Sequence, residues 1–337
     1  MKSVTVASTQ LVQQHILDLR TYLNTRILGQ SNLVSRLLIA LLADGHLLVE
    51  GAPGLAKTRA VKELSLGVEG HFHRIQFTPD LLPGDLTGTD IYHPEDGSFV
   101  FQPGPIFHNM VLADEINRAP AKVQSALLEA MAERQVTIGG KTYPLPELFL
   151  VMATQNPIEQ EGTYPLPEAQ LDRFLMYVKI GYPDADIERD ILMLARREAL
   201  AATSFNTKKA PAVDRITPLP QTVLFEARKQ VLDVHTSEGL ENYLVQLVVA
   251  TRDPSNYSEA LARWLRYGAS PRATIALDRC SKAHAWLDGR DYVTPEDIHV
   301  IAHDVLRHRI LLTFEAEAEG ISSDDFLDEL LRLVALP

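Results

Sequence analysis

The sequence predicts an α/β fold in which a parallel β-sheet flanked by helices is followed by an all-helical domain. Three short apolar runs read as buried parallel strands, and they cover residues 46–50, 110–115 and 148–154. A stretch at 201–219 loses hydrophobic periodicity, and the pattern after it is helical throughout. We therefore expect an α/β core at 1–200, a linker at 201–219 and a C-terminal all-α domain at 220–337.

Bulk composition narrows the class of protein. The chain has 337 residues, enough to bury a sizeable core, and a formal net charge of -12. This charge argues against electrostatic binding of nucleic acid or of an acidic membrane surface. The lone Cys280 excludes an intrachain disulfide and fits a reducing compartment. Because no apolar run approaches about 18 residues and the N-terminus lacks a signal-peptide core, we expect a cytoplasmic protein without membrane insertion.

The stretch HLLVEGAPGLAKT at 46–58 predicts a phosphate-binding loop between a strand and a helix. Gly51 and Gly54 can adopt backbone angles closed to other residues, so successive N–H groups can turn toward an anion. Lys57 can reach the β- and γ-phosphates, and the Thr58 hydroxyl can bind Mg²⁺. A strand-to-helix turn that happens to hold Lys-Thr is the alternative. The residues expected to bind nucleotide here are Gly51, Ala52, Pro53, Gly54, Leu55, Ala56, Lys57, Thr58 and Arg59.

One position of this loop departs from the usual G-x-x-x-x-G-K-[ST] pattern, because Ala56 stands where the last glycine is expected. Alanine is tolerable there if the position already has right-handed helical angles, since only a positive φ demands glycine.

A second motif places two carboxylates at the end of a strand. The apolar run 110–115 ends in Asp114 and Glu115, which puts both at the carboxyl edge of a parallel sheet, where ligands bind. Asp114 is expected to complete the Mg²⁺ shell through water, and Glu115 to polarise the attacking water. Apolar strands ending in Asp-Glu are common, but the pairing with the loop at 51–58 favours the functional interpretation.

Two residues complete the candidate catalytic set. Asn156 follows the strand at 148–154, where it could orient the lytic water or touch the γ-phosphate; a turn-forming Asn before proline is the alternative. Arg173 lies between a short helix at 167–173 and a strand at 174–180, in a tight and otherwise apolar context. A salt-bridged structural arginine is the alternative for Arg173.

Three residues outside these motifs are candidates for contact with the nucleotide. Leu28 and Gly29 precede the loop and could pack on an adenine ring, with plain core packing as an equal alternative for Leu28. Arg272 lies in the first turn of a helix that begins at Ser270-Pro271, where the helix dipole disfavours a cation. A nucleotide phosphate or a structural carboxylate would resolve this conflict, and the nucleotide is the favoured interpretation.

Two irregular segments interrupt the α/β pattern. Residues 78–109 are rich in proline and glycine and predict an ordered, exposed excursion that contains a small hairpin. Residues 135–147 predict a second hairpin with Gly139-Gly140 at its turn.

The histidines do not predict a metal site. His71 and His73 could share one strand face, but no third ligand lies at a recognisable spacing, and His303 and His308 are five residues apart. The basic and aromatic interleaving that single-stranded nucleic acid requires is absent as well.

The order of these motifs resembles the MoxR family of AAA+ ATPases, in whose phosphate loop alanine usually replaces the last glycine. GAPGLAKT is similar to that loop, and further segments are similar to the Walker B, sensor 1, arginine-finger and sensor 2 motifs: VLADEINRA (111–119), VMATQNP (151–157), LPEAQLDRF (166–174) and GASPRA (268–273). The excursion at 78–109 resembles the helix-2 insert, and the hairpin at 135–147 resembles the pre-sensor-1 hairpin. The resemblance covers essentially the whole chain.

The resemblance implies an AAA+ core with a helical lid, and a ring, usually hexameric, that binds ATP and Mg²⁺ between subunits. Arg173 would then reach a neighbour's γ-phosphate, and Arg272 would contact nucleotide from the lid. Family members are thought to be chaperone-like remodellers that assemble or activate protein complexes, commonly with a partner that contains a von Willebrand factor A domain.

Three hypotheses for the function remain open at this point. The first is an Mg²⁺-ATP hydrolase that remodels a protein client. The second is the motor subunit of a metal chelatase, and the third is a nucleotide-gated binding scaffold with negligible hydrolysis. A motor acting on DNA is disfavoured by the net charge.

Overall fold

The computed structural model describes residues 2–157, 162–203 and 216–336, and it confirms a parallel sheet flanked by helices. The sheet has five strands in the order β2-β5-β8-β1-β9, all of them parallel. Their bounds are β1 Leu47–Glu50, β2 Phe72–Gln76, β5 Met110–Asp114, β8 Leu150–Gln155 and β9 Met176–Lys179. The carboxyl ends of β1, β5 and β8 therefore meet at one edge, each directly followed by one of the predicted motifs.

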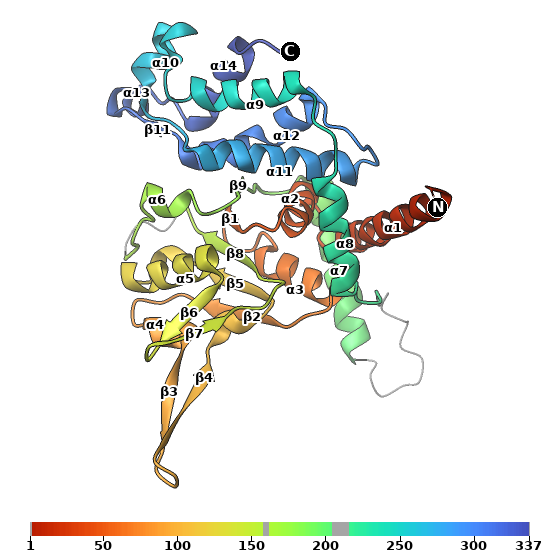
Figure 1. Cartoon of the computed structure of the whole chain (residues 1–337), viewed down its shortest axis with the longest axis vertical. Coiled ribbons are helices and arrows are strands. Elements are labelled where there is room, and N and C mark those ends of the chain that lie inside the picture. The colour runs from red at the N-terminus through yellow and green to blue at the C-terminus, as the bar shows by residue number, and fades with distance from the viewer. Residues whose placement is uncertain (1, 158–161, 204–215, 337) are drawn as a thin grey trace.

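Helices cover both faces of this sheet, as Figure 1 shows. Alternate strand residues point to opposite faces, so the apolar side chains of β5 and β8 divide between two clusters. One cluster is shared with helices near the N-terminus and with the C-terminal domain, and the other with α5. The helices of the core are α1 Lys2–Arg26, α2 Ser31–Leu42, α3 Lys57–Gly67, α5 Ala121–Glu133, α6 Glu168–Leu171 and α7 Ala185–Thr203.

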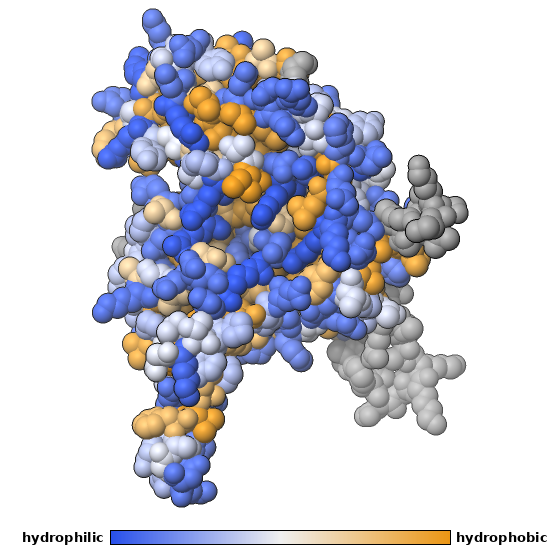
Figure 2. Space-filling model, in the orientation of Figure 1, coloured by the Kyte–Doolittle hydropathy of each residue, from blue (hydrophilic) through white to orange (hydrophobic). Residues whose placement is uncertain are grey.

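The excursion between β2 and β5 is ordered and carries a hairpin that projects away from the body of the chain (Figure 1). It consists of α4 Pro83–Thr87, β3 Gly88–His93, β4 Ser98–Pro103 and η1 Pro105–Phe107. The second hairpin, β6 Gln135–Ile138 and β7 Lys141–Pro144, joins the first through a stack of Phe101 on Tyr143, with ring centroids 4.0 Å apart. Figure 2 shows an apolar band across the projecting hairpin, and Ile91, Phe99 and Val100 are the exposed apolar residues of this hairpin.

The C-terminal domain is helical, as predicted, with one short pair of strands that the sequence analysis did not predict. Its longer helices are α8 Gln221–Leu232, α9 Glu238–Ala250, α11 Pro271–Leu287, α12 Pro295–Leu306 and α14 Ser323–Leu333, with short helices α10 Glu259–Trp264 and α13 Phe314–Ala318 between them. A two-stranded antiparallel sheet, β10 Leu265–Tyr267 with β11 Leu311–Leu312, ties α10 to the end of α12. Strands of two and three residues are too short to show an alternating pattern in the sequence.

The bounds of the predicted linker at 201–219 stay a prediction. Helix α7 continues to Thr203, and Leu219 already pairs with Val68 in a parallel bridge. Residues 204–215, which make up most of the predicted linker, lie outside the described residues.

The helical domain is fastened to the core by buried ion pairs. Arg36 on α2 donates to Asp304 on α12 at 2.6 Å, and both side chains are less than a tenth exposed. Arg309, which follows α12, donates from Nε to Asp172 at 2.8 Å. Because removing one partner of such a pair leaves an uncompensated buried charge, these contacts fix the position of the domain.

Candidate nucleotide-binding site

The loop between β1 and α3 adopts left-handed backbone angles at two positions. Gly54 has φ +85°, which glycine adopts at no steric cost, and its surroundings leave the space above its Cα open. Ala56 has φ 57° and ψ 16°, so it does not have the right-handed angles that would let alanine fit without strain. A left-handed alanine costs roughly 1–2 kcal/mol. The chain therefore keeps the loop conformation that glycine would favour and stores strain in it.

The ammonium group of Lys57 lies at the mouth of this loop. Its Nζ donates to the carbonyl oxygen of Gly51 and lies 3.5 Å from that of Gln155, at the end of β8. These contacts hold the side chain folded back over the loop. The ammonium group and the positive end of the α3 helix dipole would both stabilise an anion bound between them.

A cavity of about 400 Å³ brings most of the predicted site residues together. It is lined by Pro53, Gly54, Ala56, Lys57, Thr58, Arg59, Arg74, Asp114, Glu115 and Asn156. Asp114 ends β5 and Glu115 follows it, while Asn156 follows β8. The Thr58 hydroxyl and the cations Lys57 and Arg59 come from the start of α3, and the cation Arg74 comes from β2. The cavity thus combines hydrogen-bond donors for phosphate with hard oxygen ligands of the kind that Mg²⁺ prefers.

Asp114 sits at the centre of this constellation. Its Oδ1 accepts a 2.6 Å hydrogen bond from the Thr154 hydroxyl on β8. Its Oδ2 accepts from Arg74 on β2, at 2.7 Å from Nη2 and 3.1 Å from Nε. The Asp114 side chain is only 12% exposed, so these partners compensate for the burial of its charge.

Glu115 is held by neighbours on both sides. Its Oε2 accepts from Gln76 Nε2 at 2.8 Å and lies 3.0 Å from Arg118 Nε. Its backbone has φ 58° and ψ 51°, a left-handed conformation that is costly for a residue with a side chain, and its N–H donates to Thr154 at 2.9 Å. Strained residues of this kind cluster at functional sites.

A smaller cavity of about 110 Å³ lies beside the loop and is mostly apolar. Leu28 lines it, together with Leu55, Arg59 and side chains of α7 that include Ile191, Leu194 and Ala195. Gly29 has φ +76°, and an added Cβ would come within 2.6 Å of Ile187, so only glycine allows this close approach to α7. Arg59 is fixed by two hydrogen bonds to Glu198, which hold its pKa above the ordinary value.

The structure does not bring Arg173 and Arg272 to the loop. Both line a separate cavity of about 350 Å³ that also contains Arg134, Arg279 and Arg309. Arg173 donates to the carbonyl oxygen of Leu128 at 2.7 Å, and Arg272 lies 3.5 Å from Asp172. The Asp172 carboxylate therefore offsets the unfavourable interaction of Arg272 with the helix dipole. A structural carboxylate is the alternative in the sequence analysis, which favours a nucleotide phosphate.

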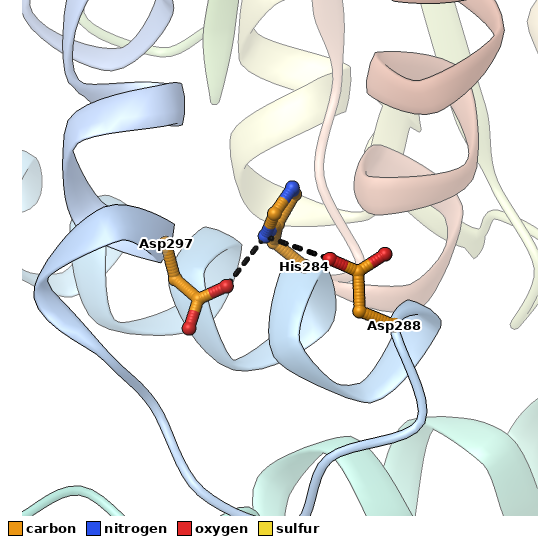
Figure 3. A group of neighbouring side chains, drawn as sticks. All are labelled: His284, Asp288 and Asp297. Atoms are coloured by element: carbon orange, nitrogen blue, oxygen red, sulfur yellow. Dashed lines mark hydrogen bonds and ion pairs between the residues drawn. The ribbon is translucent and has the colours of Figure 1, made fainter.

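Within the described residues, one group of side chains has the spacing of a metal site: His284, Asp288 and Asp297, shown in Figure 3. Arg290 already donates to both oxygens of Asp297, at 2.6 Å from Nη1 to Oδ2 and 2.5 Å from Nη2 to Oδ1, and His284 Nδ1 lies 2.6 Å from Oδ1. Burial would raise the pKa of Asp297, but these hydrogen bonds hold it well below the ordinary value. A cation would have to displace Arg290, so we interpret the group as a structural tie between α11 and α12.

Three residues of the site escaped the sequence analysis: Arg74, Gln76 and Thr154. Arg74 and Gln76 alternate with Ile75 along β2, which faces them toward the same side of the sheet as Asp114. The signal that could have found them is the placement of Arg74 and Gln76 on either side of the apolar Ile75 in the strand.

The fold and the cavity have the arrangement of a P-loop protein, and comparison with known proteins gives its class. Residues 46–176 match the family described as "ATPase family associated with various cellular activities (AAA)", and residues 259–330 match the AAA lid domain. The lid match falls on the C-terminal helical domain.

Relatives place the chain within this class. "Chaperone MoxR1" of Mycobacterium tuberculosis is 46% identical over 92% of this chain and 79% of its own length. "Protein MoxR" of Paracoccus denitrificans is 33% identical over 90% of this chain and 91% of its own. A crystal structure of a protein from Cytophaga hutchinsonii has a TM-score of 0.89 and 46% identity, and covers 99% of this chain and 98% of that one. The chain belongs to the MoxR family of AAA+ ATPases.

Among the described residues, no helix combines the length and the apolar character needed to cross a membrane.

Proposed function

We propose that the chain binds ATP with Mg²⁺ in the 400 Å³ cavity and hydrolyses it. The observation that carries this proposal is the convergence of Lys57, Thr58, Asp114, Glu115 and Asn156 on one cavity beside the phosphate loop. Leu28 and the α7 side chains would hold the adenine in the adjoining apolar cavity. The same chemistry, with donors for phosphate and acids for a metal, serves phosphoryl transfer in other P-loop proteins.

Each residue has a role that follows from its position. Lys57 would leave its two carbonyl partners for the β- and γ-phosphates, and the Thr58 hydroxyl and Asp114 carboxylate would hold Mg²⁺. When bound, Mg²⁺ supplies positive charge that offsets the charge of the phosphates. Glu115 would accept the proton of the attacking water, and Asn156 would orient that water or contact the γ-phosphate.

The separate position of Arg173 and Arg272 supports a site shared between two copies of the chain. Neither arginine lines the cavity of Lys57 as the described residues form it, so a second copy would have to bring these cations to the terminal phosphate. An arginine supplied in trans is a known way to neutralise charge that develops there. A contact between two different surfaces closes into a ring if the rotation permits. We propose a homo-oligomeric ring, and a hexamer is the size that the family resemblance implies.

We further propose that the chain uses ATP hydrolysis for chaperone-like remodelling of a protein client. The relative from Mycobacterium tuberculosis, which is named a chaperone, supports this proposal. A partner with a von Willebrand factor A domain is part of this proposal. The exposed apolar band on the β3–β4 hairpin is a surface that a client could contact (Figure 2).

Two inactive variants test the shared site. Glu115→Gln should retain ATP binding and lose turnover by at least about two orders of magnitude, because the proton acceptor is gone. Arg173→Ala should also be inactive. The control Glu133→Gln removes an exposed carboxylate at the end of α5 and should hydrolyse ATP like wild type.

Mixing the two inactive variants then separates a shared site from a self-contained one. In a ring mixed one to one, about a quarter of the interfaces pair an intact Glu115 with an intact Arg173 from the neighbour, so about a quarter of the wild-type rate should return. A mixture that stays inactive although the two variants co-assemble would place both residues in the site of a single chain.

A further inference from the structure

Arg74 reaches the nucleotide cavity from the edge of the sheet. It lies on β2, the edge strand, two residues before Gln76, which is in register with Asp114 on β5. Both side chains therefore lie on the cavity side of the strand, and Ile75 between them is buried on the other face. The family motifs named above do not include this strand.

The guanidinium of Arg74 holds the carboxylate that the proposed function assigns to Mg²⁺. Both of its contacts, from Nη2 and from Nε, go to Oδ2 of Asp114. Because Oδ1 accepts from the Thr154 hydroxyl, each carboxylate oxygen already has a partner in this structure. Oδ2 accepts from both guanidinium nitrogens, so a metal, or water in its shell, can reach this oxygen only if the guanidinium gives up its place.

The two partners differ in how easily they can move. The side chain of Arg74 is 49% exposed, whereas that of Asp114 is 12% exposed. A half-exposed arginine can rotate into solvent and recover its hydration, but the carboxylate is fixed between two strands. Arg74 Nη2 also donates to Gln76 Oε1 at 2.9 Å, which keeps the guanidinium close to the cavity.

We propose that Arg74 is a built-in competitor for Mg²⁺ at Asp114. In the nucleotide-free chain it neutralises the buried carboxylate, and binding of the metal with a nucleotide displaces it. Nucleotide binding by the wild-type chain therefore depends less on Mg²⁺ than binding by a chain that has Asp114 but lacks Arg74. The inference rests on the proposed function, because it takes Asp114 as a residue that serves the metal.

The test measures binding without hydrolysis. The affinity for a fluorescent ADP analogue, N-methylanthraniloyl-ADP, is determined with saturating Mg²⁺ and with EDTA, and the ratio gives the factor by which Mg²⁺ tightens binding. In Arg74→Ala this factor should rise about fivefold over wild type, the effect of removing a half-exposed ion pair. Arg74→Lys, which keeps the charge, should give a smaller rise. The control Arg263→Ala removes an exposed arginine of the lid and should leave the factor unchanged.

Each result decides the question. A factor in Arg74→Ala that equals or falls below the wild-type factor overturns the proposal while leaving nucleotide binding intact. Wild-type protein that fails to bind the analogue under either condition rejects the proposed function instead. If Arg74→Ala does not melt cooperatively, Arg74→Gln and Arg74→Lys carry the comparison, and the same criterion applies to them.

Discussion

The left-handed alanine of the phosphate loop makes a sharp prediction about stability. Ala56 is in the left-handed region, at φ 57° and ψ 16°, where a side chain costs roughly 1–2 kcal/mol and glycine almost nothing. Ala56→Gly removes this strain but also makes the unfolded chain more flexible, which costs about 0.5–1 kcal/mol. The net result should be a gain of about 0.5–1 kcal/mol in the free energy of unfolding, or about 2 °C in melting temperature.

The assay is equilibrium unfolding in urea, with Ala126→Gly as the matched control. Ala126 lies in the middle of α5, in the same α/β core, where the backbone is right-handed. The same substitution should destabilise the protein there by about 1 kcal/mol, because glycine gains nothing in a helix interior. Opposite signs for the two variants are expected. If Ala56→Gly were as destabilising as Ala126→Gly, the strain at Ala56 would not exist.

Two further predictions concern the buried His46 and the apolar cavity beside the phosphate loop. Burial lowers the pKa of His46, which is 5% exposed, to about 4, while its Nδ1 accepts from the Val151 N–H at 3.1 Å. The folded protein therefore favours neutral His46. This preference contributes about 3 kcal/mol to the free energy of unfolding, fully present above the unfolded pKa of 6.5 and lost as the pH falls through the folded pKa of about 4. Urea unfolding at pH 7.5 and pH 5 should show about 2 kcal/mol of this loss, because pH 5 is still above the folded pKa, and His46→Gln should flatten it; equal wild-type stability at both pH values would contradict the assignment. In the apolar cavity, Ala195→Trp should weaken ATP binding by at least about tenfold by filling the space proposed for adenine, measured by fluorescence titration, whereas the exposed Leu200→Trp at the far end of α7 should bind normally.

The fold could be predicted because its signals are local. Apolar runs directly followed by Gly51, by Asp114-Glu115 and by Asn156 fix both the strands and the edge at which they end, and the structure places these motifs on one cavity. The short β10–β11 pair could not be predicted, because its partners are more than forty residues apart and each is too brief to show a period.

The finer geometry of the site depends on neighbours that the sequence does not place together. The conformation of Ala56 reflects the demand of the loop, which overrides the preference of alanine. Arg74 joins the site through the pairing of β2 with β5, and Arg272 lies near Asp172 because the lid docks there. Long-range packing of this kind leaves no mark on the spacing of residues along one helix or strand.

The grip of Arg309 on the core has a mechanical consequence. This lid residue donates to the side chain of Asp172 at 2.8 Å and to the carbonyl oxygens of Phe174 at 2.7 Å and Leu175 at 3.3 Å, so it clasps the chain on both sides of Arg173. A rotation of the lid must either break these bonds or drag Arg173 along. The lid and Arg173 therefore move together as one rigid unit. A rotation of the lid would change the position of Arg173 and of any contact that Arg173 makes.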